Sequence, residues 1–165
     1  MDEAFHIVDK NDRIIGQAAR SEVHGNPELI HRVSHVLVFN SQGALFLQKR
    51  ALSKDVQPGR WDTSVGGHVD KNESYATAAM REMKEELGFT PESIQFLYKY
   101  LHSNDYESEY VSTFRCTWDG PIYINRDEIM DGRFWTLNEI RAHRDRSAFT
   151  PNFLDELDRF QAYIA

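Results

Sequence analysis

Residues 67–89 read GHVDKNESYATAAMREMKEELGF and contain the strongest helical pattern of the chain. Within it, apolar side chains recur at the spacing of a helix that buries one side. Asn72 can cap the start of such a helix, and Gly88 can supply the positive φ that follows its end. The spacing therefore predicts a helix over Glu73–Leu87. The residues expected on its buried stripe are Ala76, Ala79, Met80, Met83 and Leu87.

Three carboxylates, those of Glu82, Glu85 and Glu86, lie on the other side of the predicted helix. At about 100° per residue they share an arc of roughly 100°. Like charges at these spacings destabilise a helix by roughly 0.2–0.5 kcal/mol per pair, so a compensating cation is expected. Mg²⁺ or Mn²⁺ fits, because hard divalent ions prefer carboxylate oxygens and bridge to substrate phosphates. Arg81 can pair with one carboxylate and fix its rotamer. A solvated acidic face is the usual alternative for a charge cluster taken alone.

Strand-like segments flank this helix on both sides in the sequence. They are Phe5–Asp9, Val33–Phe39, Ala44–Lys49, Ile94–Leu101, Glu109–Thr117 and Arg133–Thr136. Gly43 can give the loop between the second and third segments the positive φ of a hairpin. Further on, Thr136–Glu139 resembles a capping box, and Thr150-Pro151 opens a second helix. Strands with flanking helices indicate α/β layers. The second helix is expected to turn inward Leu154, Leu157, Phe160 and Ile164.

Length and composition indicate one domain over residues 1–165, because 41% of the residues are hydrophobic and no linker or repeat interrupts the chain. The net charge of −7 argues against a nucleic-acid polymer or an anionic membrane as the main partner. No apolar run approaches the roughly 18 residues that cross a bilayer. Because Cys116 is the single cysteine and the first residues lack signal-peptide features, the cytoplasm is the expected compartment.

The 23 residues from Gly67 to Phe89 match the signature of one family at every defined position. The pattern is Gly, five residues, Glu, seven residues, Arg-Glu, an apolar residue, any residue, Glu-Glu, any residue, Gly and an apolar residue. The chain thus resembles the Nudix hydrolases, which implies a Nudix-type α/β/α sandwich with a mixed β-sheet and a loop–helix–loop site for metal and diphosphate. The resemblance implies that Glu82, Glu85 and Glu86 bind Mg²⁺ or Mn²⁺. It further implies that one of these, or a loop acid, is the general base, and that Glu73 and Arg81 brace the helix.

A second resemblance, to the type I isopentenyl diphosphate isomerases of the same superfamily, extends over nearly the whole chain. The segments that carry it are Arg50–Lys54, Pro58–Trp61, Ser64–His68, Ile124–Asp131 and Ala148–Pro151. It implies a second site for Mn²⁺, Zn²⁺ or Mg²⁺ with three histidine and two glutamate ligands, a donor set that suits these ions. The matching residues are His24, His31, His68, Glu107 and Glu109. His6, His35, His102 and His143 are interpreted as structural.

The isomerase resemblance also implies residues that bind diphosphate. Arg20, Arg50 and Lys54 match its phosphate-binding positions, and arginine and lysine contact phosphate well. Gly66 and Gly67 are expected to bind the substrate beside them. For each basic residue, a plain surface charge is the alternative.

Several departures from the isomerase pattern bear on the chemistry. Gly66 stands where the isomerases carry a catalytic cysteine, and Asn152 stands where they carry a tryptophan that shelters a carbocation. Glu82 and Glu85, in contrast, restore the hydrolytic signature. Allylic isomerisation needs two proton-transfer groups, one on each side of the double bond. Only the group on the Glu109 side, with nearby Tyr100, is present in this chain. Strand alternation turns Cys116 away from Glu109, which indicates a small buried hydrophobe.

The sequence thus favours a metal-dependent hydrolase that cleaves a diphosphate linkage in a small molecule of nucleoside or prenyl type by attack of water at phosphorus. The expected catalytic residues are Arg81, Glu82, Glu85, Glu86 and Glu109. One alternative is an isopentenyl diphosphate isomerase, which Gly66 and Asn152 disfavour. Another is a noncatalytic domain that senses a diphosphate ligand. The organic half of the substrate and the oligomeric state stay open. Four aromatic residues suit either the substrate pocket or the core: Trp61, Tyr100, Tyr106 and Phe149.

Overall fold

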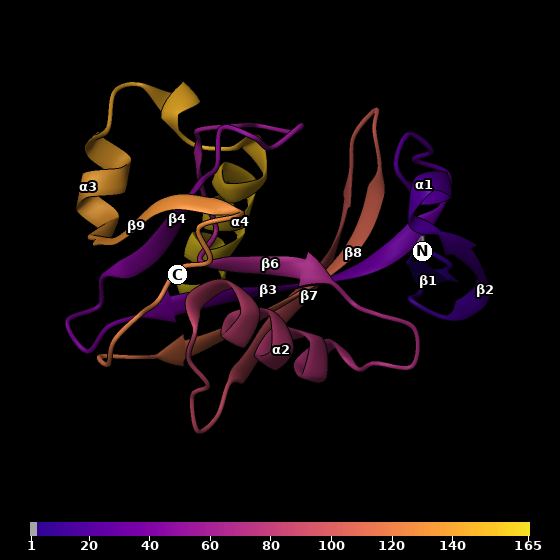
Figure 1. Ribbon diagram of the computed structural model, residues 1–165, viewed down its shortest axis with the longest axis horizontal. Coiled ribbons are helices and arrows are strands. Elements are labelled where there is room, and N and C mark those ends of the chain that lie inside the picture. Colours follow the sequence, from indigo (N-terminus) through magenta and orange to yellow (C-terminus); the bar gives the residue numbers. More distant parts are fainter. Residues whose placement is uncertain (1–2) are drawn as a thin grey trace.

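The central element of the fold is β3 (Ile30–Phe39), a strand in which every residue from Val33 to Phe39 is buried. The computed structural model describes residues 3–165, and its strands in that range form one sheet (Figure 1). β3 pairs parallel with β8 (Ser108–Thr117) and antiparallel with β1, β4 and β6. The sheet is therefore mixed, as expected. The other strands are β1 (Ala4–Val8), β2 (Ile14–Ala19), β4 (Leu45–Arg50), β5 (Trp61–Asp62), β6 (Val65–His68), β7 (Gln95–Ser103) and β9 (Ile129–Trp135).

Helices cover both faces of this sheet. α2 (Tyr75–Leu87) lies on one side, and α3 (Leu137–Ala142) and α4 (Pro151–Ile164) lie on the other (Figure 1). Because side chains alternate along a strand, Val36 and Val38 of β3 pack with α2, whereas Leu37 and Phe39 pack with α4. This α/β/α layering confirms the expected fold class. A short helix, α1 (Arg20–Val23), precedes β3, and a 3₁₀ turn (Arg146–Ala148) precedes α4. In the described range, no helix is long and apolar enough to cross a membrane.

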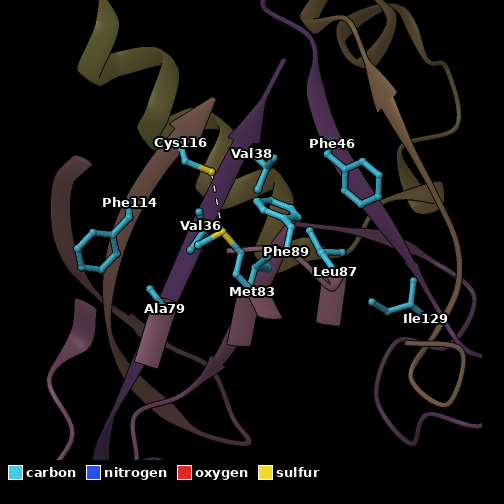
Figure 2. Close-up of a cluster of buried hydrophobic side chains, with 11 residues drawn as sticks. Val36, Val38, Phe46, Ala79, Met83, Leu87, Phe89, Phe114, Cys116 and Ile129 are labelled. Carbon is cyan, nitrogen blue, oxygen red and sulfur yellow. Dashed lines mark hydrogen bonds between the residues drawn. The ribbon is translucent and has the colours of Figure 1, made fainter. Parts of the chain in front are cut away.

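The core beneath α2 contains the cysteine. Met83 and Leu87 of α2 belong to one buried cluster with Phe89, Phe114 and Cys116 (Figure 2). The Sγ atom of Cys116 lies 3.9 Å from Met83 Sδ, and burial raises the pKa of the Cys116 thiol to about 11. The thiol thus stays protonated and packs as a small hydrophobe on the face predicted by strand alternation.

The ends of α2 differ in how well the sequence predicts them. Gly88 has a φ of +72° and ends the helix, as expected. The start is at Tyr75, where Ser74 Oγ accepts from Thr77 N at 3.1 Å, so the cap predicted at Asn72 is wrong. Asn72 has a φ of +69°, and an N-cap residue needs an extended backbone. Ala76 is exposed rather than buried, because the covered stripe runs through residues 78, 79, 83 and 87.

The C-terminal helix begins as predicted, with Thr150 Oγ1 accepting from Phe153 N at 3.0 Å. Its buried side chains are those of Phe153, Glu156, Leu157 and Phe160. Ile164, expected to face inward, is 51% exposed at the last position of the helix. The capping box of Thr136 and Glu139 at the start of α3 is confirmed.

Candidate active site

Two adjoining cavities of about 500 and 490 Å³ form a cleft beside the glycine pair of β6. We call the first the carboxylate cavity, because Glu82, Glu85 and Glu86 line it, and the second the histidine cavity, because His24, Glu107 and Glu109 line it. The lining that both share consists of Arg20, His35, Arg50, Lys54, Asp62, Gly66, Gly67, His68 and Asn152. The predicted site residues of α2 and, apart from His31, those of the histidine cluster therefore line one cleft.

Glu86 is the buried member of the α2 carboxylates, with 5% of its surface exposed. Its Oε1 accepts from Gln48 Nε2 at 2.8 Å, whereas its Oε2 has no hydrogen-bond partner among residues 3–165. Burial raises the pKa of Glu86 well above its usual value, with Glu82 and Glu128 adding to the rise against the Gln48 hydrogen bond. The burial of Glu86 is inconsistent with a purely solvated acidic face. An unpartnered buried carboxylate oxygen fits a divalent cation, because a charge removed from water needs a counter-charge.

Arg81 organises the two more open carboxylates. Its Nη1 donates to Glu82 Oε1 at 2.8 Å and to Glu85 Oε2 at 3.2 Å. Its Nε and Nη2 donate to both oxygens of Glu73 at 2.8 and 2.9 Å, and Nη2 also reaches the His68 carbonyl at 3.1 Å. Burial raises the pKa of Glu82 although Arg81 opposes the rise, and Glu85 is 56% exposed. The bracing geometry expected of Glu73 and Arg81 is therefore present, and it ties α2 to the end of β6.

Gly67 lies against the Glu82 side chain. A Cβ atom at this position would lie 2.3 Å from Glu82 Cδ, closer than any real contact. We therefore expect Gly67→Ala to displace the Glu82 carboxylate and to lower by about tenfold or more the kcat/KM of a reaction that depends on this carboxylate. Gly16→Ala is the matched control, because a Cβ at Gly16 meets nothing within 4 Å in the described chain. Steady-state kinetics of both variants with Mg²⁺ would check this, and full activity in Gly67→Ala would show that the position of Glu82 is unimportant.

The histidine and glutamate residues predicted for a second metal site lie together. His24 follows α1, His31 is on β3, His68 ends β6, and Glu107 precedes β8. One ligand atom from each of these four lies within 4.8 Å of those of the others. Glu109 joins them, because its Oε2 lies 3.6 Å from His31 Nε2. The parallel register of β3 and β8 pairs His31 with Glu109 and so brings the two side chains to the same face of the sheet.

The chemistry of these groups fits a metal ion. His31 is fully buried, yet neither ring nitrogen has a hydrogen-bond partner within residues 3–165, and the same holds for Glu107 Oε2. Burial, with the neighbouring His31, lowers the pKa of His68 to about 3, so this imidazole stays neutral. Burial and the charge of Glu109 raise the pKa of Glu107 to about 7. Burial also pushes the pKa of Glu109 upward, but His31 outweighs it and lowers the pKa. Neutral imidazoles and carboxylates are the ligands that Mn²⁺, Zn²⁺ and Mg²⁺ accept.

The three basic residues predicted to bind diphosphate line both cavities. Arg50 Nη1 lies 3.3 Å from Asp62 Oδ2, and Lys54 Nζ lies 3.4 Å from Glu128 Oε1. Arg20 Nη1 lies 3.6 Å from Glu3 Oε2. Partly exposed pairs of this kind are worth little, so an entering phosphate can replace the carboxylate partners. The cleft therefore carries cationic groups beside its carboxylates.

Some features of the cleft escape sequence reasoning. His35, interpreted as structural, lines both cavities and pairs across the sheet with Gly66, which also lines them. It lies on the same face of β3 as His31, four residues earlier. Strand periodicity is the signal that could have placed it there. The OH of Tyr100, which the isomerase resemblance groups with Glu109, donates to Glu156 at 3.0 Å. Gly66 and Asn152 do line the cleft, whereas Cys116 packs in the core beneath α2.

Comparison with known proteins agrees with this picture. The NUDIX domain profile matches residues 29–157. An uncharacterized Nudix hydrolase of Pseudomonas aeruginosa is 36% identical over 162 residues, which cover 98% of this chain and 94% of that protein. Isopentenyl-diphosphate Delta-isomerase 2 of Photorhabdus laumondii is 36% identical over 146 residues, covering 86% and 82% of the two chains. The crystal structure of DR0079 from Deinococcus radiodurans superposes with a TM-score of 0.82 at 25% identity, covering 95% and 98%.

Proposed function

The chain belongs to the Nudix family and resembles its isomerase-like branch, and from this premise we propose that it is a metal-dependent hydrolase that cleaves a diphosphate linkage in a small molecule of nucleoside or prenyl type. Water attacks phosphorus in this reaction. The observation that carries the proposal is the buried Glu86, whose Oε2 lacks a partner in the described chain and which faces the same cavity as Glu82 and Glu85. The Nudix hydrolases among the relatives support a pyrophosphohydrolase.

In this proposal each group has a defined task. Glu82, Glu85 and Glu86 would hold Mg²⁺ or Mn²⁺, and the ion would supply charge neutralisation for phosphoryl transfer. Arg81 keeps Glu82 and Glu85 in place through its hydrogen bonds. Arg20, Arg50 and Lys54 bind the diphosphate, and the backbone at Gly66 and Gly67 leaves room for it. One of the α2 carboxylates, or Glu109 from the histidine cavity, accepts the proton of the attacking water.

The second metal site is part of the proposal, since its donor set fits Mn²⁺, Zn²⁺ or Mg²⁺. The residues that would hold the ion are His24, His31, His68, Glu107 and Glu109. The same cluster is the specific observation that favours the second candidate function, isopentenyl diphosphate isomerisation, and relatives that carry that name add to it. Gly66 weighs against isomerisation, because glycine cannot exchange a proton with the substrate on its side of the cleft.

The experiment that tests the proposed function is a phosphate-release assay over nucleotide and prenyl diphosphates with Mg²⁺ or Mn²⁺. Wild-type protein should release phosphate from at least one class, and Glu82→Gln should lower that rate by about tenfold or more, because it removes a negative ligand of the cation. Undiminished turnover in Glu82→Gln would show that hydrolysis does not need the Glu82 carboxylate of α2. Interconversion of the two C5 diphosphates without phosphate release would favour the isomerase, and binding without any turnover would favour a sensor.

A further inference from the structure

A fully buried carboxylate on α4 lies behind the cleft. Glu156 is 0% exposed and belongs to neither metal cluster. Its Oε1 is bonded to His35 Nδ1 at 2.8 Å, to Thr113 Oγ1 at 2.8 Å and to Tyr100 OH at 3.0 Å. Tyr98 OH donates to its Oε2. Three neighbouring strands, β3, β7 and β8, thus direct their polar side chains at one carboxylate.

The hydrogen bonds around Glu156 determine the charges of Glu156 and His35. The three hydroxyl groups donate to Glu156, which stabilises its ionised form. A buried anion needs a cation, and in residues 3–165 the ion pair of Glu156 is with His35. Burial lowers the pKa of His35, but the hydrogen bond and charge of Glu156 outweigh burial and raise it. Burial likewise raises the pKa of Glu156, and its bond to His35 outweighs that effect and lowers it. Both pKa shifts favour a protonated His35 imidazole beside an ionised Glu156 carboxylate.

The other side of the imidazole faces the cleft. With Nδ1 directed at Glu156, Nε2 points away from α4, and the ring lines both cavities. His35 pairs across the sheet with Gly66, and a Cβ there would lie 3.2 Å from His35 Cδ2 and 3.5 Å from Nε2. Glycine at this position therefore leaves the Nε2 edge of the ring open to the space between the carboxylates and the histidine cluster. No hydrogen-bond partner for Nε2 is present within the part of the chain that the structure describes.

We propose that His35, held by Glu156, is a diphosphate-binding residue that donates a hydrogen bond from Nε2 to a phosphate oxygen between the two cavities. This inference rests on the proposed function, because it assumes that the cleft binds a diphosphate. Glu156 is then a positioning residue, since it contacts the imidazole and not the substrate. Tyr98, Tyr100 and Thr113 hold Glu156 in turn through their hydrogen bonds.

The test uses methylenediphosphonate, a diphosphate mimic that is not hydrolysed, titrated calorimetrically into the Mg²⁺-loaded full-length protein. Glu156→Gln keeps the size of the side chain but removes the charge that holds His35 as a cation. We expect this variant and His35→Gln to bind the mimic about 10- to 100-fold more weakly, because each loses a charge-assisted hydrogen bond. In hydrolysis, the same variants should raise KM more than they lower kcat. The matched control is Asp158→Asn, an exposed carboxylate on the same helix, which should bind as the wild type does.

Two further measurements test the inference if the His35 or Glu156 variant does not fold. Gly66→Ala retains the ion pair but places a methyl group at the ring edge, and it should also weaken binding. In the wild type, the ¹⁵N resonance of His35 Nε2 should shift when the mimic is added. Wild-type affinity in the His35 and Glu156 variants, or an unmoved resonance at saturation, would overturn the inference. Tight binding that depends on His35 without hydrolysis of any diphosphate would overturn the proposed function alone. A wild type that hydrolyses a diphosphate but does not bind the mimic would overturn the inference alone.

Discussion

Glu86→Gln is expected to lower diphosphate hydrolysis by roughly a hundredfold to a thousandfold, the range seen when one electrostatic stabiliser of a transition state is removed. The wild-type carboxylate is buried, and its Oε2 has no hydrogen-bond partner in residues 3–165. Glutamine can still accept from Gln48 through its own carbonyl oxygen, but it lacks the charge that would hold the cation. The loss should therefore fall on catalysis and not on folding.

Unfolding experiments separate these two effects. Burial raises the pKa of Glu86, so the ionised side chain destabilises the metal-free fold, and Glu86→Gln should unfold at an equal or higher denaturant concentration. Glu92→Gln is the control, because it removes an exposed carboxylate soon after α2. The expected result is full activity in Glu92→Gln and almost none in Glu86→Gln, both folded. A folded Glu86→Gln protein with wild-type kinetics would contradict the assignment of Glu86 as a metal ligand.

His31→Gln is expected to remove one of two bound metal ions per chain. His31 is completely buried, and both ring nitrogens lack partners within the described residues. Loss of a direct ligand should weaken metal binding at the second site by more than about a hundredfold. Even the loss of a residue that only hydrogen-bonds to a metal ligand weakens metal binding about 10- to 100-fold. Titration with Mn²⁺, followed by electron paramagnetic resonance, gives the number of ions and their affinities.

The control for this titration is His6→Gln on β1, the strand next to β3. Strand alternation turns His6 to the face opposite Phe5, whose ring stacks on His31 at 5.7 Å. His6→Gln should therefore bind two ions as the wild type does, and His31→Gln only the ion of the α2 carboxylates. Two ions of unchanged affinity in His31→Gln would show that the cluster of histidine and glutamate residues is not a metal site.

The sequence predicts the α2 helix and the grouping of its carboxylates well, because the information is local. Glu82, Glu85 and Glu86 lie within five residues of one another, and Gly88 ends the helix by its own backbone preference. The start of α2 is less predictable, since both Asn72 and Ser74 are good caps. The choice between them depends on the preceding turn, in which Glu73 accepts from Asp70 N and is held by Arg81, eight residues further on.

The parts that escape prediction depend on distant residues. β6 includes Gly66 and Gly67, which are poor strand formers, and it becomes a strand because β3 pairs with it. β2 is an edge strand interrupted by Gly16, and β5 has only two residues, so neither gives a clear alternating pattern. His35 acquires its setting from Glu156, 121 residues later in the chain. No local pattern contains that pairing.

We expect this cleft to hydrolyse a diphosphate linkage with the help of the α2 carboxylates. The most direct measurement is ³¹P NMR of a nucleotide or prenyl diphosphate incubated with the protein and Mg²⁺ in H₂¹⁸O. Attack of water at phosphorus predicts a cleaved product whose phosphate carries ¹⁸O, formed by the wild type and lost in Glu86→Gln. Intact diphosphates across the panel, with interconversion of the two C5 diphosphates instead, would contradict the claim.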